Sequence, residues 1–153
     1  MRKALMGSRA TFRAVVFAND TRGVWDGDVR SLLARAFEGP GGEILSELAP
    51  TSGEAFVVKP RYSAFDLTPL ALILEDLEVE HVHLMGMATE MCVTQTAIDA
   101  RERGYEVSVV ADACATLSEE HEAIALDYLE RVMSVELVSA ASVSDPTKPH
   151  SLR

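Results

Sequence analysis

A strand, a glycine turn and a helix are predicted within one stretch, Val82–Ala100 (VHLMGMATEMCVTQTAIDA). Apolar residues lead into Gly86, and apolar positions then recur at close to helical spacing from Val93 to Ala100. A buried strand that turns directly into a helix is the repeating unit of α/β folds with parallel sheets. The stretch also places Cys92 in the first turn of its helix, just beyond the end of a strand.

The position of Cys92 allows two interpretations, one as a reactive residue and one as a structural residue. Unpaired backbone N–H groups and the helix dipole favour an anion at a helix start, so Cys92 would be favoured as the nucleophilic thiolate. The same N–H groups could hold an oxyanion. A cysteine among apolar residues is, however, more often a small core residue. From this stretch alone both interpretations of Cys92 stay open.

A second stretch, FVVKPRYSAF at Phe56–Phe65, favours the interpretation as a reactive residue. Its apolar strand delivers Lys59 to a strand end, which is where α/β sheets place their active groups. A cation beside a thiol stabilises the thiolate further. The two stretches together predict a Cys92–Lys59 pair at one edge of the sheet.

Strands and helices alternate along the rest of the chain, which predicts an α/β fold with a parallel sheet. Strands are expected at Phe12–Phe17, Phe56–Lys59, Val82–Met85, Val107–Ala111 and Val135–Val138. Helices are expected over Arg2–Arg9, Val29–Phe37, Ile44–Leu48, from Thr68–Pro69 to Leu77, from Cys92 to Arg103, and over Glu119–Arg131. The buried side of the last helix is expected to consist of Ile124, of Leu126 or Tyr128, and of Leu129. We expect one domain over residues 1–141 and a tail over residues 142–153.

Composition excludes several classes of partner. The chain has 153 residues and a net charge of −10, with acidic residues spread along it, and phosphate binding needs basic patches. We therefore expect no nucleic-acid partner. No run approaches the roughly 20 apolar residues of a membrane span, and the segment Met1–Ala10 lacks the apolar region of a signal peptide. A soluble, cytoplasmic protein with no membrane partner is the expectation.

The chain resembles the isochorismatase-like cysteine hydrolases from about Phe12 to Val138. The resemblance is carried by VVKPRYSAF, by GMATEMCVTQTAIDARERGYEVSVVADACATLS and by HEAIALDYL. A lysine segment combined with G-x-x-T-x-x-C-V-x-x-T-A is far more specific than a lone cysteine. The resemblance implies a three-layer α-β-α fold, with a mostly parallel Rossmann-like sheet and helices on both faces.

The resemblance also implies a chemistry, in which a thiolate attacks the carbon of a small amide or carbamoyl-type substrate. Carried over, Cys92 is the nucleophile, Lys59 is the assisting lysine, and the backbone N–H groups of Ala88 and Cys92 form the oxyanion hole. The Met87–Ala88 peptide bond would be cis. No cofactor is implied, the partner is a small-molecule substrate, and a homo-oligomer, a dimer or a tetramer, is expected.

Loop residues near the strand ends are candidates for substrate binding. For each of them the alternative is ordinary packing or solvation, and the sequence leaves that open. The candidates are Asn19, Asp20, Trp25, Tyr62, Phe65 and Thr89.

The chain departs from the family pattern at its start. Family members open with a central strand ending in an aspartate that accepts the thiol proton, and nothing before Phe12 reads as such a strand. A wrongly assigned start codon or a truncated gene would explain this gap. Without that strand, its two neighbours would pair directly, pair with another chain, or leave open edges. Asp20, also at a strand end, is a possible replacement for the aspartate. The alternative function is a catalytically impaired member that serves as a binding or scaffold subunit.

Histidines and the second cysteine complete the list of candidates. The loop NDTRGVWDGD at residues 19–28 contains no histidine, and the histidines at 81, 83, 121 and 150 form no ligand set, so we expect no metal and no nicotinamidase activity. Cys114 is expected to be buried and inert. A redox pair of Cys92 with Cys114 is the least favoured alternative.

Overall fold

The computed structural model describes residues 1–21, 29–39 and 41–143 of the chain. The elements follow one another as α1 (Arg2–Thr11), β1 (Val16–Asp20), α2 (Val29–Glu38), α3 (Gly42–Leu48), β2 (Ala55–Lys59), α4 (Leu70–Asp76), β3 (His81–Met87), the π-helical turn η1 (Thr89–Val93), α5 (Thr94–Glu102), β4 (Glu106–Ala115), α6 (Glu119–Arg131), β5 (Glu136–Val138) and α7 (Ala140–Val143). The predicted alternation of strands and helices is confirmed.

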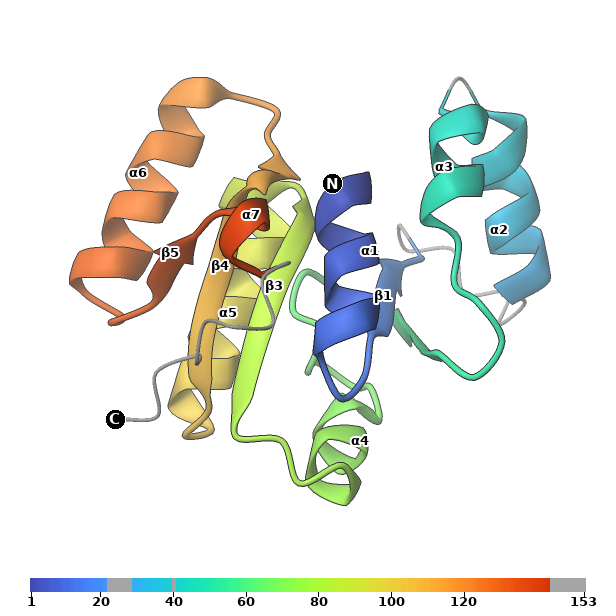
Figure 1. Cartoon of the computed structure of the whole chain (residues 1–153). Coiled ribbons are helices and arrows are strands. Elements are labelled where there is room, and N and C mark those ends of the chain that lie inside the picture. Colours follow the sequence, from blue (N-terminus) through green and yellow to red (C-terminus); the bar gives the residue numbers. More distant parts are fainter. Residues whose placement is uncertain (22–28, 40, 144–153) are drawn as a thin grey trace.

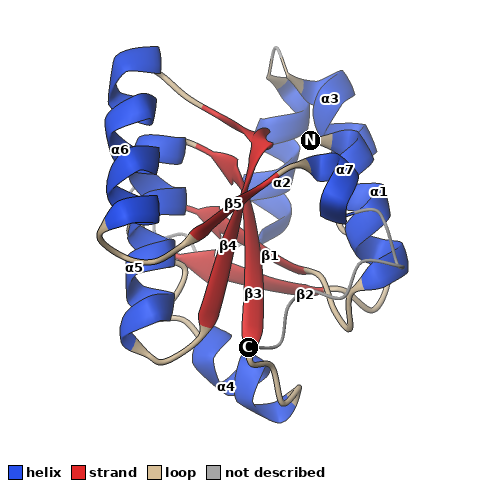
Figure 2. Cartoon of the chain, turned by 60° about the vertical axis from the view of Figure 1, so that its left-hand side comes forward, coloured by secondary structure: helices blue, strands red, loops and turns tan. Residues whose placement is uncertain are grey.

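All strand pairings in the described residues are parallel, and they form two separate sheets. One contains β1 and β2, and the other has the order β3–β4–β5. Helices α5 and α6 lie on one side of the strands and α1 and α7 on the other (Figures 1 and 2). The predicted α/β fold with helices on both faces of parallel strands is therefore confirmed.

The sheet is interrupted between β1 and β3. These two strands are not hydrogen-bonded to each other in the described residues, and each is an end strand of its own sheet. Direct pairing of these two strands, one of the three arrangements that the sequence left open, is therefore not what the structure shows. Within the described part of this chain the two sheets are therefore held together by side chains and helices, because no continuous ladder of hydrogen bonds joins them.

Two apolar clusters fill the space on the two faces of the larger sheet. The larger cluster packs α5 and α6 on the strands through Ala97, Ala100, Val109 and Leu129, all fully buried. The smaller cluster joins α1 and α7 to β4. Burial of these apolar surfaces supplies most of the stability of such a domain.

One prediction about α6 is wrong. Ile124 was expected on its buried side, but 62% of this residue is exposed. Leu129 is fully buried and Leu126 is partly buried against the larger cluster, whereas Tyr128 is 43% exposed. The helix bears apolar residues on both sides, so periodicity alone could not decide which side faces the sheet.

The ends of several elements also differ from the sequence prediction. The first strand begins at Val16 instead of Phe12 and includes Asn19 and Asp20, because its ladder follows β2 residue by residue, from Ala55 to Lys59. The predicted strand at Val107–Ala111 is part of the longer β4, which runs on through Cys114. The helix predicted to start at Thr68–Pro69 begins at Leu70, and the hydroxyl of Thr68 accepts a hydrogen bond from the N–H of Leu70.

Helix α1 and the residue after it contact segments of both sheets. Near its end, the guanidinium of Arg9 donates hydrogen bonds of 2.6 and 2.7 Å to the two carboxylate oxygens of Glu54, which directly precedes β2. The residue after the helix, Phe12, stacks its ring on His83 of β3 at a centroid distance of 4.4 Å. Contacts from one helix thus reach both sheets where the ladder is interrupted (Figure 1).

Replacing Arg9 by methionine is expected to lower the free energy of unfolding at pH 7 by about 2 kcal/mol. The Arg9 guanidinium, through its hydrogen bonds, lowers the pKa of Glu54 to about 2. A carboxylate with a lowered pKa stabilises the fold above its unfolded pKa of 4.5, and this contribution disappears as the pH falls towards 2. Urea denaturation at pH 7 and pH 3 measures both effects.

The matched control is Arg2→Met, because Arg2 pairs with Glu47 at the surface, where both side chains are more than half exposed. We expect this variant to change stability by less than about 0.5 kcal/mol. Equal losses from the two substitutions would contradict a special role of the Arg9–Glu54 pair.

The part of the chain that the structure describes contains no helix long and apolar enough to cross a membrane. At the C-terminal end of this part, α7 packs Val143 into the smaller cluster. The packed structure therefore extends at least to Val143.

Candidate active site

Lys59 lies at the point where β2 ends, and its side chain is enclosed. Only 4% of the residue is exposed. Its ammonium donates hydrogen bonds to the Sγ of Cys92 at 3.2 Å and to the backbone carbonyl of Arg61 at 2.9 Å, and it lies 3.7 Å from Oδ2 of Asp20. The structure therefore brings Lys59 and Cys92 together, from segments 33 residues apart in the sequence.

Cys92 is held in a π-helical turn instead of the regular first turn of an α-helix. The turn, Thr89–Val93, follows Ala88, whose carbonyl accepts hydrogen bonds from the N–H groups of Met91 and Val93. The peptide bond between Met87 and Ala88 is cis. Strand β3 shifts its register at Gly86, which has a φ of +137° that favours glycine.

Thr96 ties the turn to the loop that follows Lys59. Its hydroxyl donates to the carbonyl of Cys92 at 2.7 Å and accepts from the N–H of Ala64 at 3.0 Å. One side chain therefore fixes the distance between the cysteine turn and the lysine loop. The sequence analysis did not identify this role, although Thr96 is part of the quoted motif.

Two glutamates also hold the turn that contains Cys92. Local sequence patterns did not indicate this role for either of them. Glu122 of α6 accepts a hydrogen bond of 2.6 Å from the hydroxyl of Thr89. Glu90 accepts hydrogen bonds from the hydroxyl of Thr116 and the N–H of Leu117. Its own backbone N–H, followed by these two donors, lowers the pKa of its carboxyl group. Their partners lie about 26 to 33 residues away, so only tertiary structure could reveal these contacts.

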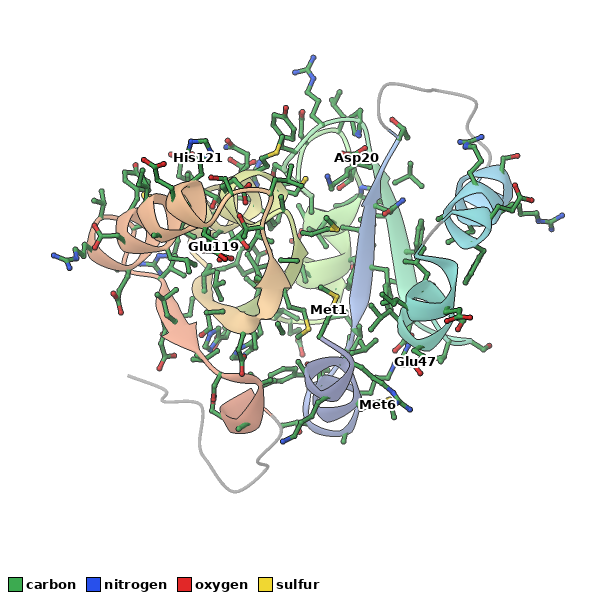
Figure 3. The ribbon with its side chains drawn as sticks, turned by 90° about the horizontal axis from the view of Figure 1, so that it is seen from above. Met1, Met6, Asp20, Glu47, Glu119 and His121 are labelled. Atoms are coloured by element: carbon green, nitrogen blue, oxygen red, sulfur yellow. The ribbon has the colours of Figure 1, made fainter. Side chains whose placement is uncertain are left out.

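The substrate-binding candidates fall in different places. Asp20 lies beside Lys59, and Figure 3 shows it at the end of the β1 ribbon next to β2. Asn19 is exposed and projects from the opposite face of β1, as strand alternation requires. The side chain of Thr89 is bonded to Glu122 and to the carbonyl of Ala115, and Thr89 is fully buried. Trp25 lies outside the described residues.

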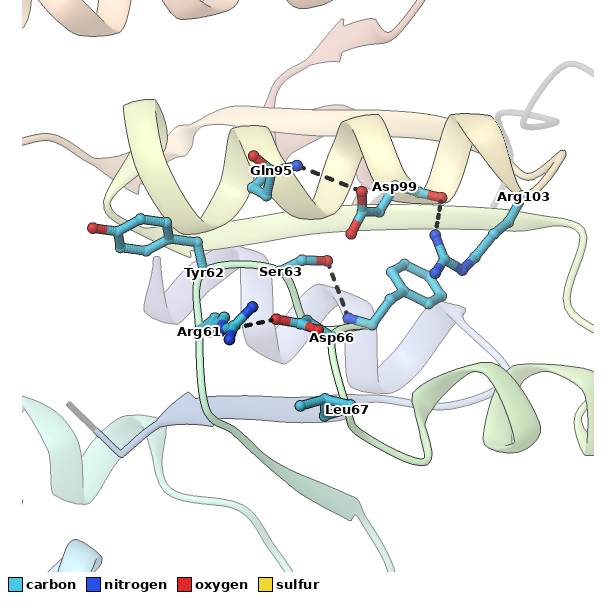
Figure 4. A pocket seen from close by; sticks show the side chains of 9 residues that line it. Arg61, Tyr62, Ser63, Asp66, Leu67, Gln95, Asp99 and Arg103 are labelled. Atoms are coloured by element: carbon cyan, nitrogen blue, oxygen red, sulfur yellow. Dashed lines mark hydrogen bonds and ion pairs between the residues drawn. The ribbon is translucent and has the colours of Figure 1, made fainter. Parts of the chain in front are cut away.

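The two aromatic candidates after Lys59 have different environments. Phe65 is 7% exposed and belongs to the larger apolar cluster, where the guanidinium of Arg103 lies over its ring. Tyr62 is 51% exposed. It lines an open hollow of about 450 Å³ between the loop 61–67 and Gln95 and Asp99 of α5, with Arg103 just after the helix (Figure 4). Neither Lys59 nor Cys92 lines this hollow, so the candidate active site is the Lys59–Cys92 contact and not the hollow.

Cys114 differs from Cys92 in its surroundings. Both cysteines are free thiols. Burial raises the pKa of the Cys114 thiol to about 11, so this residue stays protonated at neutral pH. Such a thiol is a poor nucleophile. The residues that the structure describes also hold no group of three or more His, Cys, Asp or Glu side chains arranged for a metal ion.

Comparison with known proteins shows which family the chain belongs to. The profile described as Isochorismatase domain matches residues 9–142. The chain belongs to the isochorismatase family. The predicted resemblance is therefore confirmed, and the match includes both Lys59 and Cys92.

Several relatives of the chain are named amidases or isochorismatase proteins. It is 30% identical to the uncharacterized isochorismatase family protein YaaI from Bacillus subtilis over 129 residues, 84% of this chain and 71% of YaaI. The crystal structure of N-carbamoylsarcosine amidase from Thermoplasma acidophilum is 30% identical, with a TM-score of 0.71, and the match covers 91% of this chain and 79% of that one.

A third relative is ureidoacrylate amidohydrolase RutB from Klebsiella pneumoniae. It is 38% identical over 71 residues, which are 46% of this chain and 30% of RutB. The prediction that the chain is a hydrolase agrees with its family and with these named amidases.

Proposed function

We propose that this chain is a cofactor-independent cysteine hydrolase that cleaves a C–N bond of a small amide or carbamoyl-type substrate. The observation that carries the proposal is the 3.2 Å contact between the enclosed Lys59 ammonium and the Cys92 sulfur. An enclosed ammonium beside a thiol favours the thiolate, which is the attacking species. The named amidases among the relatives support the choice of bond.

In the proposed reaction, Cys92 Sγ attacks the substrate carbonyl carbon and the C–N bond breaks. The proton that leaves the thiol ends on the departing nitrogen. The backbone N–H groups of Ala88 and Cys92 receive the developing oxyanion, and the Lys59 ammonium offsets negative charge on the sulfur. Water then adds to the thioester carbon, the C–S bond breaks, and a water proton restores the thiol. The cycle consumes one water and requires no cofactor.

The substrate pocket in this proposal opens at the carboxyl ends of the strands. Asp20 lies there, and Tyr62 is the exposed aromatic residue of the neighbouring loop. Trp25 remains a proposed contributor to the rim, and Thr89 and Phe65 would support its wall, whereas Asn19, on the opposite face of β1, is not included. The residues 19–28 contain no histidine, so we do not include nicotinamide among the proposed substrates.

We also propose a homo-oligomer, a dimer or a tetramer, located in the cytoplasm. In the described residues the end strands β1, β2, β3 and β5 have unpaired edges, and α6 and the residue after it expose Ile124, Tyr128 and Val132, which are features that invite association. A reducing compartment keeps Cys92 available as a free thiol. Sedimentation of the full chain at several concentrations tests the oligomer, and a monomer at all of them would refute it.

Iodoacetamide is expected to label Cys92 at pH 6 at least about tenfold faster than it labels a free cysteine, because the Lys59 ammonium lies 3.2 Å from its sulfur and offsets negative charge there. Peptide mapping should find the label on Cys92 and not on Cys114, whose pKa is raised to about 11. Labelling no faster than that of free cysteine would refute the proposed nucleophile.

Turnover is tested with a panel of small amides, N-carbamoyl amino acids and ureido acids, with nicotinamide included as a contrast. Hydrolysis of a panel member should disappear in Cys92→Ala and persist in Cys114→Ala. The binding or scaffold alternative is not favoured by the amidase relatives, and it would be supported only if Cys92 reacted slowly and the whole panel were inert.

A further inference from the structure

We propose that Asp20 is the counter-charge of Lys59, a positioning residue that holds the ammonium in place whenever the sulfur is neutral. This inference rests on the proposed function and assigns Asp20 a defined role within it. The role does not require Asp20 to touch the substrate or to accept the thiol proton.

Register and distance place Asp20 in this role. The last ladder position of the β1–β2 sheet pairs Asp20 with Lys59, so both side chains project from the same face at the same strand end. The Oδ2 atom of Asp20 lies 3.7 Å from Nζ of Lys59, and the N–H of Thr21 donates to the carbonyl of Lys59 to close the ladder. The position of the carboxylate is thus set by backbone pairing.

Burial makes a counter-charge necessary. The side chain of Lys59 is 5% exposed, whereas that of Asp20 is 29% exposed. An enclosed ammonium without a nearby anion tends to move towards water. The carbonyl of Arg61 supplies a hydrogen bond to Lys59 but no net charge. The Asp20 carboxylate, 3.7 Å away, supplies that charge.

The charged groups of the neighbouring elements have other partners. On the η1 turn, Glu90 accepts from Thr116 and Leu117, and on α6 Glu122 accepts from Thr89. In the loop after β2, Arg61 pairs with Asp66. Among the ion pairs of the described residues, the one that Lys59 makes is with Asp20.

The need for this counter-charge changes during the reaction. When Cys92 is a thiolate, the sulfur itself can balance the ammonium. When Cys92 is a thiol or a thioester, the sulfur is neutral and the ammonium depends on Asp20. Loss of the carboxylate should therefore spare the attack by the thiolate and impair hydrolysis of the thioester. No bond to Asp20 forms or breaks in either step.

The test uses the full chain and p-nitrophenyl acetate, whose acetyl group is transferred to Sγ as p-nitrophenolate leaves, after which water releases acetate. The initial burst reports the transfer, and the steady rate reports thioester hydrolysis. In Asp20→Asn we expect the burst and the iodoacetamide labelling at pH 6 to be retained or faster, because a negative charge near the sulfur has been removed. The steady rate should fall about tenfold.

Mass spectrometry and a conservative variant complete the test. Intact mass spectrometry should show the acetylated chain accumulating in this variant. Asp20→Glu should recover part of the steady rate. The matched control, Asp127→Asn on the exposed surface of α6, should behave like the unaltered chain.

Other outcomes separate the two proposals. No burst and no fast labelling in the unaltered chain would refute the proposed nucleophile itself. A normal burst with an unchanged steady rate in Asp20→Asn would overturn the counter-charge role and leave the proposed function intact. Loss of both labelling and burst in a folded Asp20→Asn variant would also overturn it, because Asp20 would then be needed before the attack.

Discussion

Replacing Lys59 by methionine is expected to reduce hydrolysis of a small amide by about 100-fold or more. The substitution removes the cation that lies 3.2 Å from the Cys92 sulfur. It keeps an unbranched side chain of similar length in the enclosed position. Steady-state kinetics on a substrate found in the panel gives the loss in kcat/KM, and iodoacetamide labelling at pH 6 should slow in parallel.

The control for this prediction is Lys3→Met, which removes the same charge from the exposed surface of α1. It should leave both rates within about twofold of the unaltered chain. Thermal unfolding of both variants tests whether the fold persists. A folded Lys59→Met variant with nearly full activity would mean that Lys59 does not assist the sulfur.

Replacing Leu129 by alanine is expected to lower the free energy of unfolding by about 3 kcal/mol. Leu129 is fully buried, and its side chain joins α6 to the larger apolar cluster. Truncation would leave a cavity between the helix and the sheet that the surrounding strands cannot fill. Because domains of this size are stable by only about 5–15 kcal/mol, urea denaturation should show a large shift of the midpoint.

Ile124→Ala is the matched control on the same helix. This residue is 62% exposed, so its truncation should cost less than about 0.5 kcal/mol. A larger loss from Ile124→Ala than from Leu129→Ala would mean that α6 packs with the opposite face on the sheet, or that a partner covers Ile124.

The fold class could be predicted from local sequence patterns because each strand and helix has a clear periodicity. Apolar runs such as that at Val107–Ala111 become strands wherever both faces are covered. The helix Glu119–Arg131 was predicted with its bounds, and Ser118 caps it by accepting a hydrogen bond from the N–H of His121. Capping and periodicity act over a few residues, so the sequence alone contains this information.

The choice of faces and the exact ends of strands could not be predicted in this way. The start of β1 depends on its pairing with β2, about 39 residues later in the chain. The buried side of α6 depends on which of its apolar sides packs against the sheet. The interruption between β1 and β3, and the position of α1 across it, likewise depend on contacts between distant segments.

The sequence by itself determined the α/β alternation, the family motif, and the two residue types, a cysteine and a lysine, that the proposed chemistry requires. Each of these follows from patterns a few residues long or from a motif contained in one segment. Only the tertiary structure decided that Lys59 contacts Cys92, that Asp20 lies 3.7 Å from that lysine, and that Glu90, Thr96 and Glu122 hold the cysteine turn. These contacts join strand ends and helices far apart in the chain, and parallel pairing and burial of the core bring them to one edge of the sheet.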